Sequence, residues 1–161
     1  MAKAKPVPGL NADDAYAEAA AKIVEVRAGE LMEHAEGVLD TGDIERLHDM
    51  RVATRRLRAA LEIFEPCFQE KPFRETLAAV KRLADALGER RDRDVAIVSL
   101  GRFNEQMAAP DRRGVGSLID RLRREQEEAN AALTAHVDQA NLRSLRESLG
   151  ELVASARAVT A

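Results

Sequence analysis

The chain has 161 residues, of which 45% are hydrophobic and 33% are charged, and its formal net charge is −3 at pH 7. This length suits one domain, and abundant alanine, leucine and charged residues without tryptophan are typical of helices with solvated outer faces, so β structure is not expected. The negative net charge argues against a general nucleic-acid binder, and it restricts any anion-binding site to a local patch.

The single cysteine, Cys67, excludes a disulfide within the chain and is compatible with a reducing compartment. Residues 1–8 lack the apolar stretch of a signal peptide, and no segment approaches the roughly 20 apolar residues that span a membrane. We therefore expect a cytoplasmic protein. Its predicted organisation is a flexible N-terminal lead over residues 1–10, followed by one helical bundle over residues 11–161.

Apolar periodicity and capping residues predict the helices in chain order. Asn11 can cap a first helix whose apolar stripe reaches Val38. Asp43 is a good cap for a second helix, which continues to about Glu65 because a proline follows. Pro72 suits the first turn of a third helix.

Gly88 is expected to kink or break this third helix, so that a fourth helix begins at Arg91. Pro and Gly residues over 108–116 predict a loop, and two further apolar stripes predict helices over about residues 118–137 and 142–156. Short connections make successive helices antiparallel neighbours. The predicted fold is an all-α antiparallel bundle of about six helices.

The most informative segment covers residues 48–58 and reads HDMRVATRRLR. At about 100° per residue, its histidine and three of its arginines fall within roughly a quarter of the helix circumference: His48, Arg51, Arg55 and Arg58. Apolar residues gather on the opposite side, at Met50, Ala53, Leu57, Ala60, Leu61 and Phe64. Because guanidinium groups match phosphate oxygens and stay charged near neutral pH, this arrangement suggests a polyanion as partner.

An ordinary solvated helix face is the plainer interpretation of these arginines. Such a face normally intersperses carboxylates that form i,i+4 ion pairs, yet no Asp or Glu occurs between Met50 and Ala60. A lone histidine is more often a surface or core residue, but the position of His48 one turn before Arg51 favours a role in binding. Its imidazole can donate a hydrogen bond to a phosphate oxygen, and protonation adds charge.

The run from His48 to Arg58 resembles the first motif of the CHAD family, the conserved-histidine α-helical domains. Residues 87–95, LGERRDRDV, resemble the family's LGxxRDxDV element at a comparable distance downstream. The resemblance covers about residues 13–161 and implies an antiparallel helical bundle that binds inorganic polyphosphate through basic side chains without catalysing a reaction on it. The binding residues that it implies are His48, Arg51, Arg55, Arg56, Arg58, Lys81, Arg82 and Arg91, with Asp92 in support by orienting an arginine.

Family members usually carry two related helical halves, and the resemblance here covers one of them. No second HxxR-type helix occurs, because His136 is followed by Val137, Asp138, Gln139 and Ala140 and not by an arginine ladder. We therefore expect a homodimer in which a second copy supplies the other half. Association with polyphosphate granules in the cytoplasm is a further expectation from the resemblance.

Metal sites and enzymes fit the sequence poorly. Glu45 and His48 have the Glu-x-x-His spacing of di-iron helices, but neither His34 nor His136 has a glutamate three residues before it, so no metal is expected. The chain has no phosphate-binding glycine loop, nucleophile elbow or acidic cluster suited to catalytic magnesium. We expect neither catalysis nor a cofactor.

Two other binding functions remain as alternatives. The first is a helical adaptor whose basic face docks an acidic protein partner, with Val52 and Ile63 as the only plausible apolar anchors near that face. The second, nucleic-acid binding, is less well supported, because four Phe and one Tyr provide few aromatic rings for base stacking.

Overall fold

The computed structural model describes residues 3–160, and every regular element in that range is helical. The elements in chain order are α1 (Tyr16–Glu33), α2 (Ile44–Ile63), the short 3-10 helix η1 (Glu65–Cys67), α3 (Glu70–Gln106), α4 (Arg112–Val137) and α5 (Gln139–Thr160). The predicted all-α class is confirmed. The described residues form five α-helices, because the predicted third and fourth helices are one.

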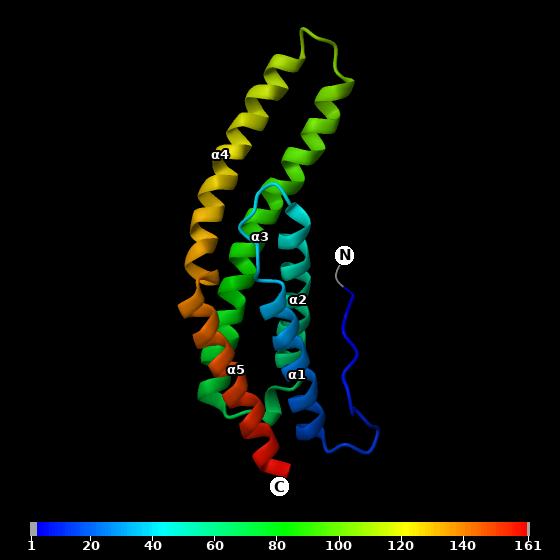
Figure 1. Ribbon diagram of the computed structural model, residues 1–161, viewed down its shortest axis with the longest axis vertical. Helices are drawn as coiled ribbons and strands as arrows, with labels where there is room; N and C mark the ends of the chain where they lie inside the picture. Colours follow the sequence, from blue (N-terminus) through cyan, green and yellow to red (C-terminus); the bar gives the residue numbers. More distant parts are fainter. Residues whose placement is uncertain (1–2, 161) are drawn as a thin grey trace.

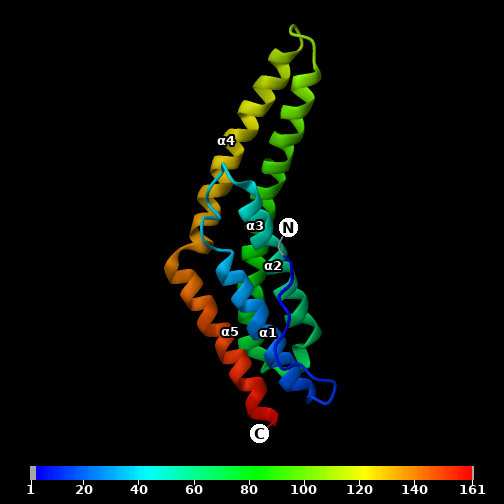
Figure 2. The same ribbon diagram turned by 45° about the vertical axis from the view of Figure 1, so that its right-hand side comes forward.

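The helices form a bundle with a projecting hairpin (Figure 1). The first half of α3 packs with α2 and α5, whereas the second half of α3 runs antiparallel to α4 and extends beyond the other helices (Figure 2). At 1.5 Å per residue, α3 is about 55 Å long, which lets it belong to both parts. Both ends of the described part of the chain lie at the bundle, away from the tip of the hairpin.

Gly88 does not interrupt α3, so the predicted break there is wrong. Buried residues lie along one face of the helix on both sides of the glycine: Leu83 and Leu87 before it, and Arg90 and Asp94 after it. A glycine inside a helix costs roughly 1 kcal/mol relative to alanine, which the packing of these side chains outweighs.

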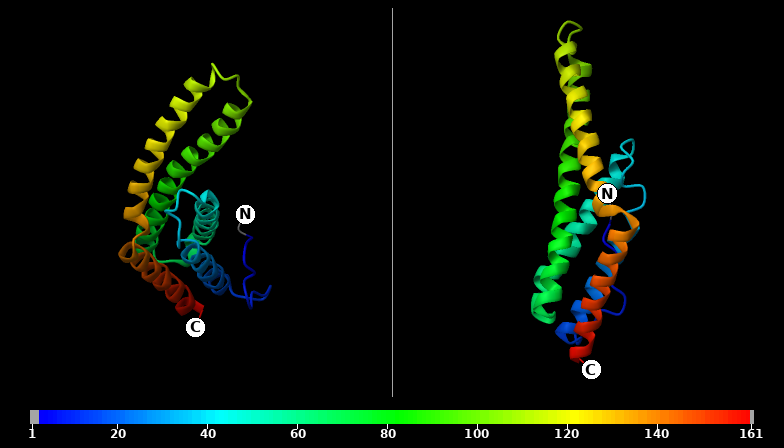
Figure 3. Two further views of the ribbon diagram at one scale, coloured as in Figure 1. Left: turned by 45° about the horizontal axis from the view of Figure 1, so that its top comes forward. Right: turned by 90° about the vertical axis from the view of Figure 1, so that its left-hand side faces the viewer.

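The predicted loop over residues 108–116 is shorter in the structure, because α4 begins at Arg112 and includes Gly114 and Gly116. The expectation that the last two helices are antiparallel is wrong. Asp138 has an extended backbone that bends the chain between α4 and α5, and α5 continues in the same general direction to pack along α1 (Figure 3). The apolar face of α5 is therefore covered by a helix far away in the sequence.

The start of α1 also differs from the prediction. Its N-cap position is Ala15, and Asn11 instead donates a side-chain hydrogen bond to the carbonyl of Gly9 at 2.9 Å. The segment before α1 is attached to that helix, because the backbone N–H of Lys5 donates to Glu30 and its ammonium group pairs with Glu33, both at 2.5 Å. Composition alone did not predict these contacts.

None of the helices in residues 3–160 combines the length and apolar character needed to cross a bilayer.

Candidate functional site

The orientation of α2 follows the sequence pattern. Asp43 caps the helix as predicted, with its carboxylate accepting from the backbone N–H of Glu45 at 3.3 Å. All of the residues predicted for the core side of this segment are buried: Met50, Ala53, Leu57, Ala60, Leu61 and Phe64. Burial of this stripe fixes the rotation of α2, so the cationic side chains are directed away from the core.

Three side chains on this side of α2, those of His48, Arg51 and Arg55, have no partner among the described residues. Arg55 is exposed, His48 and Arg51 are half-buried, and none of the three forms a hydrogen bond or ion pair within residues 3–160. The Nε atom of Arg51 is buried without an acceptor. A buried donor that lacks an acceptor costs free energy, which an anion brought close to the guanidinium group would offset in part.

Glu62 lies at the C-terminal end of the same face, where it joins α2 to α3. Its carboxylate accepts from Arg58 at 3.0 Å and pairs with Lys81 of α3 at 3.4 Å. The hydrogen bond from Arg58 is the main reason that the pKa of Glu62 lies below its usual value. Burial opposes this effect, and the charge of Arg58 and the interaction with Lys81 add to it. Two cations here share one carboxylate.

Arg91 lies at the opposite end of α2. It donates to the backbone carbonyl of Ile44 at 3.1 Å and approaches Glu45 at 3.9 Å, so α3 runs alongside α2 in the antiparallel sense. We call the surface formed by the two helices the basic face and define it as His48, Arg51, Arg55, Arg58, Lys81 and Arg91. From His48 to Glu62 it extends over roughly 20 Å of helix.

The other predicted binding residues do not join the basic face. Arg56 is directed towards α1, where its charge helps to lower the pKa of Glu30. Arg82 lines a separate cavity with His136, on a different side of α3 from Lys81. Asp92 is exposed and forms no hydrogen bond or ion pair within the described residues, so the expected contact with an arginine is absent.

Comparison with family models gives a match over most of the chain. The model described as the CHAD domain matches residues 22–161, which is nearly the whole chain. The chain belongs to the CHAD family. Comparisons with curated proteins and with solved structures give no match.

The second motif of this CHAD domain serves mainly to hold the structure together. Arg90 is fully buried and donates from Nε to Asp94 at 2.8 Å, from one terminal nitrogen to the side chain of Asn130, and from the other to the carbonyl of Asp40 at 3.5 Å. Gln126 also donates to Asp94, at 2.5 Å. These contacts join α3 to α4 and to the segment that precedes α2.

The sequence interpretation missed Arg90, although a signal was available. Arg90 and Asp94 are four residues apart and share a helix face with the apolar Leu83 and Leu87. A charged pair at i,i+4 spacing that continues an apolar stripe indicates a buried ion pair. By tying the carbonyl of Asp40 to α3, Arg90 positions the start of α2 and with it the basic face.

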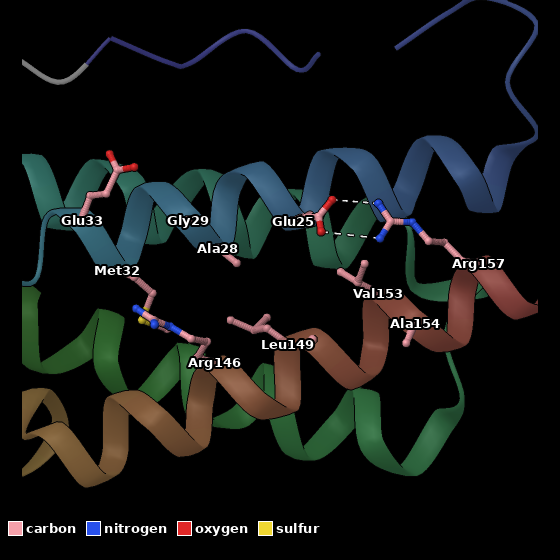
Figure 4. A pocket seen from close by; sticks show the side chains of 11 residues that line it. Glu25, Ala28, Gly29, Met32, Glu33, Arg146, Leu149, Val153, Ala154 and Arg157 are labelled. Carbon is pink, nitrogen blue, oxygen red and sulfur yellow. Dashed lines mark hydrogen bonds and ion pairs between the residues drawn. The ribbon is translucent and has the colours of Figure 1, made fainter. Parts of the chain in front are cut away.

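A cavity of about 530 Å³ lies in this CHAD domain between α1 and α5, away from the basic face (Figure 4). Its apolar side chains include Met32, Leu149 and Val153, and an ion pair of 2.7 Å between Glu25 and Arg157 crosses one end. None of the basic-face residues lines it. This groove therefore contributes nothing to an anion site on α2.

Proposed function

We propose that the protein binds inorganic polyphosphate, or a similar linear polyanion, along the basic face without catalysing a reaction on it. The observation that carries this proposal is a set of three side chains that have no partner within residues 3–160, on a helix whose opposite face is core: His48, Arg51 and Arg55. Membership of the CHAD family supports it, because the family is associated with binding of polyphosphate or triphosphate.

The shape and charge of the surface suit a linear ligand. A polymer of phosphates lying along α2 meets Arg91 at one end, His48, Arg51 and Arg55 in the middle, and Arg58 with Lys81 at the other end. Each charge-assisted hydrogen bond contributes about 1.5–3 kcal/mol, although such contributions do not add simply. Because binding of a phosphate polymer releases counterions, affinity should fall steeply as salt increases.

The carboxylates near the basic face favour binding over turnover. Glu62 and Glu45 lie at opposite ends of α2 and each approaches a cation, Arg58 and Lys81 in the first case and Arg91 in the second. Phosphoryl chemistry with magnesium requires several carboxylates that converge on one metal position. No group of three or more His, Cys, Asp or Glu side chains in residues 3–160 is arranged to hold a metal ion.

The test is binding of long-chain polyphosphate to the wild type and to an Arg51→Ala, Arg55→Ala, Arg58→Ala triple variant by isothermal titration calorimetry. A matched control changes three arginines that are exposed on α4 and removes the same charge: Arg113→Ala, Arg123→Ala and Arg124→Ala. We expect the first variant to lose binding while it stays helical, and the control to bind like the wild type. Equal losses in both variants would show that only net charge matters.

An acidic protein partner is the second candidate for the same face. The observation in its favour is Ile63, which is 62% exposed at the C-terminal end of α2 and offers an apolar anchor beside the arginines. Ile63→Ser should leave polyphosphate binding unchanged if the polymer is the ligand. Displacement of polyphosphate by polyglutamate at equal charge concentration would favour the protein partner instead.

We further propose that two copies associate and combine their basic faces, in the cytoplasm and at polyphosphate granules. The exposed apolar side chains of the projecting hairpin, Val95, Phe103 and Leu118, support association, because large apolar residues gain free energy when covered. Binding of one polymer to the basic faces of two copies would raise the avidity of binding. Light scattering should give twice the 17.7 kDa mass of one chain.

A further inference from the structure

A second cavity lies on the other side of α3 from the basic face, where α4 bends into α5. Its volume is about 420 Å³, and its lining residues come from α3, from the end of α4 and from the first half of α5. None of the six residues of the basic face lines it. The two surfaces are therefore separate, although Arg82 in the cavity and Lys81 on the basic face are neighbours in the sequence.

Arg82 and His136 bring hydrogen-bond donors into this cavity from two different helices. Arg82 is exposed and His136 is half-buried, and neither forms a hydrogen bond or ion pair within residues 3–160. Both side chains line the same cavity and carry N–H donors that suit the oxygens of a phosphoryl group, and Arg82 stays charged. Among the described residues, no carboxylate forms an ion pair with either side chain, although Glu75 lines the same cavity.

The wall of the cavity is formed over buried residues and carries hydroxyl groups. Thr76, Leu83 and Leu145 are buried beneath it, so the side chains above them rest on packed core. Ser148 lines the cavity and donates to the backbone carbonyl of Ser144 at 3.0 Å, which leaves its oxygen lone pairs available as acceptors. The hydroxyl of Ser144 has no partner within the described residues.

Two carboxylates near the cavity limit what it can hold. Asp138 is occupied as the cap of α5: a hydrogen bond from the backbone N–H of Asn141 at 2.7 Å is the main reason that its pKa is lowered. Glu75 lines the cavity and is exposed. Its negative charge repels a long polyanion, whereas its carboxylate oxygens accept hydrogen bonds from hydroxyl groups. These two properties favour a small ligand with one phosphoryl group and hydroxyls on the rest of the molecule.

We propose that this cavity is a binding site for a small hydroxylated phosphate monoester, with the phosphoryl group at Arg82 and His136. Ser144 donates to the same phosphoryl group, and the hydroxyls of the ligand reach Glu75 and Ser148. The site does not depend on binding of a polymer at the basic face. Its ligand differs from a polyphosphate in carrying one charged end and one uncharged, hydrogen-bonding end.

The three histidines of the chain allow each surface to be observed separately. His136 is in the cavity, His48 is on the basic face, and His34 lies at the end of α1, next to a pocket lined by carboxylates. Glycerol 3-phosphate is titrated into the intact chain while the imidazole signals are followed by NMR. We expect saturable shifts at His136, with His34 unaffected.

Variants then assign the site. Arg82→Ala should weaken the effect at His136 at least tenfold, whereas Arg74→Ala, an exposed substitution two turns earlier on α3, should change it less than twofold. Orthophosphate should bind at least several-fold more weakly than glycerol 3-phosphate, because it lacks the hydroxylated end. Glu75→Gln should reduce this difference between the two ligands.

Three outcomes would overturn the proposal: no saturable shift at His136, equal affinity in wild type and Arg82→Ala, or glycerol 3-phosphate shifts confined to His48. Addition of long-chain polyphosphate in a separate titration reports on the basic face through His48. A response at His48 to the polymer without a response at His136 to the monoester would leave the function of the basic face intact and remove the cavity site. A response at His136 to the monoester without a response at His48 to the polymer would keep the cavity site and remove the proposed function of the basic face.

Discussion

The arginines of the second motif and those of α2 show two uses of the same side chain. Arg90 is 0% exposed and its nitrogens contact Asp94, Asn130 and the carbonyl of Asp40, whereas Arg51 and Arg55 have no partner within the described residues. Burial of a charge requires a partner, because the loss of hydration is costly. Partners inside the protein thus indicate a structural role, and their absence on a solvated face leaves the charge for a ligand.

Removal of Arg90 should have the largest effect on stability. Arg90→Ala leaves the buried carboxylate of Asp94 without its ion pair, and we expect a loss of about 3–5 kcal/mol in the free energy of unfolding, measured with urea. The double variant Arg90→Met, Asp94→Leu should recover much of this loss, because no unpaired charge remains. A single variant within 1 kcal/mol of the wild type would show that the network is not needed.

Glu30 is a second buried charged residue and, like Arg90, it has partners inside the protein. Burial raises its pKa, but hydrogen bonds from the backbone of Lys5 and from Arg27, with the charges of Arg27 and Arg56, hold the pKa below the ordinary 4.5. A carboxyl group with a lowered pKa stabilises the fold above its unfolded pKa and loses this contribution as pH falls through the folded value.

Glu30→Gln should therefore destabilise the protein by about 1–3 kcal/mol at pH 7. The difference from wild type should decrease as pH falls below 4.5, the range in which Glu30 of the folded protein becomes protonated. Urea unfolding at pH 7, 5 and 3.5 measures this trend. A difference that stays constant over this range would mean that the carboxylate charge contributes nothing.

Loss of an unpaired arginine should weaken binding and leave stability unchanged. Arg55→Ala removes an exposed side chain without a partner in residues 3–160, so the free energy of unfolding should change by less than about 0.5 kcal/mol. Affinity for polyphosphate should fall roughly tenfold. The slope of log affinity against log salt concentration should become smaller by about one. Arg113→Ala on α4 is the matched control. A loss of stability without a loss of affinity would show that Arg55 has a structural role and does not bind the polymer.

Glu62 offers a change in the opposite direction. Its carboxylate accepts from Arg58 and pairs with Lys81, and Glu62→Gln removes the charge that neutralises these two cations. We expect affinity for polyphosphate to rise about threefold at low salt and the gain to shrink as salt screens it. Titration at two salt concentrations measures both. Unchanged affinity at low salt would mean that neither cation contacts the polymer.

His48 should produce the smallest effect, a change of a few-fold with pH. A protonated imidazole adds positive charge to the basic face and can donate hydrogen bonds from both ring nitrogens. We expect tighter binding at pH 6 than at pH 8 in the wild type, with a flatter profile in His48→Ala. The same pH dependence in both proteins would exclude His48 from the site.

The pattern of α2 was predictable because a single helix determines it. Periodicity placed Met50 and Leu57 in the core and Arg51 and Arg55 away from it, and the cap at Asp43 was recognised from its side chain. The predictions at Gly88 and Asn11 were wrong because they rested on the preferences of a single helix. Local preferences of about 1 kcal/mol indicated a break and a cap, and packing at other positions outweighed them.

The amino-acid sequence by itself determined the helical class, the two faces of α2 and the two motifs that identify the family. Only the tertiary structure showed that Arg90 is buried, that α5 packs on α1, and that the adjacent residues Lys81 and Arg82 serve different surfaces. The reason is geometric. Periodicity gives the angle between side chains on one helix, but which side meets core, solvent or another cation depends on where the neighbouring helices lie.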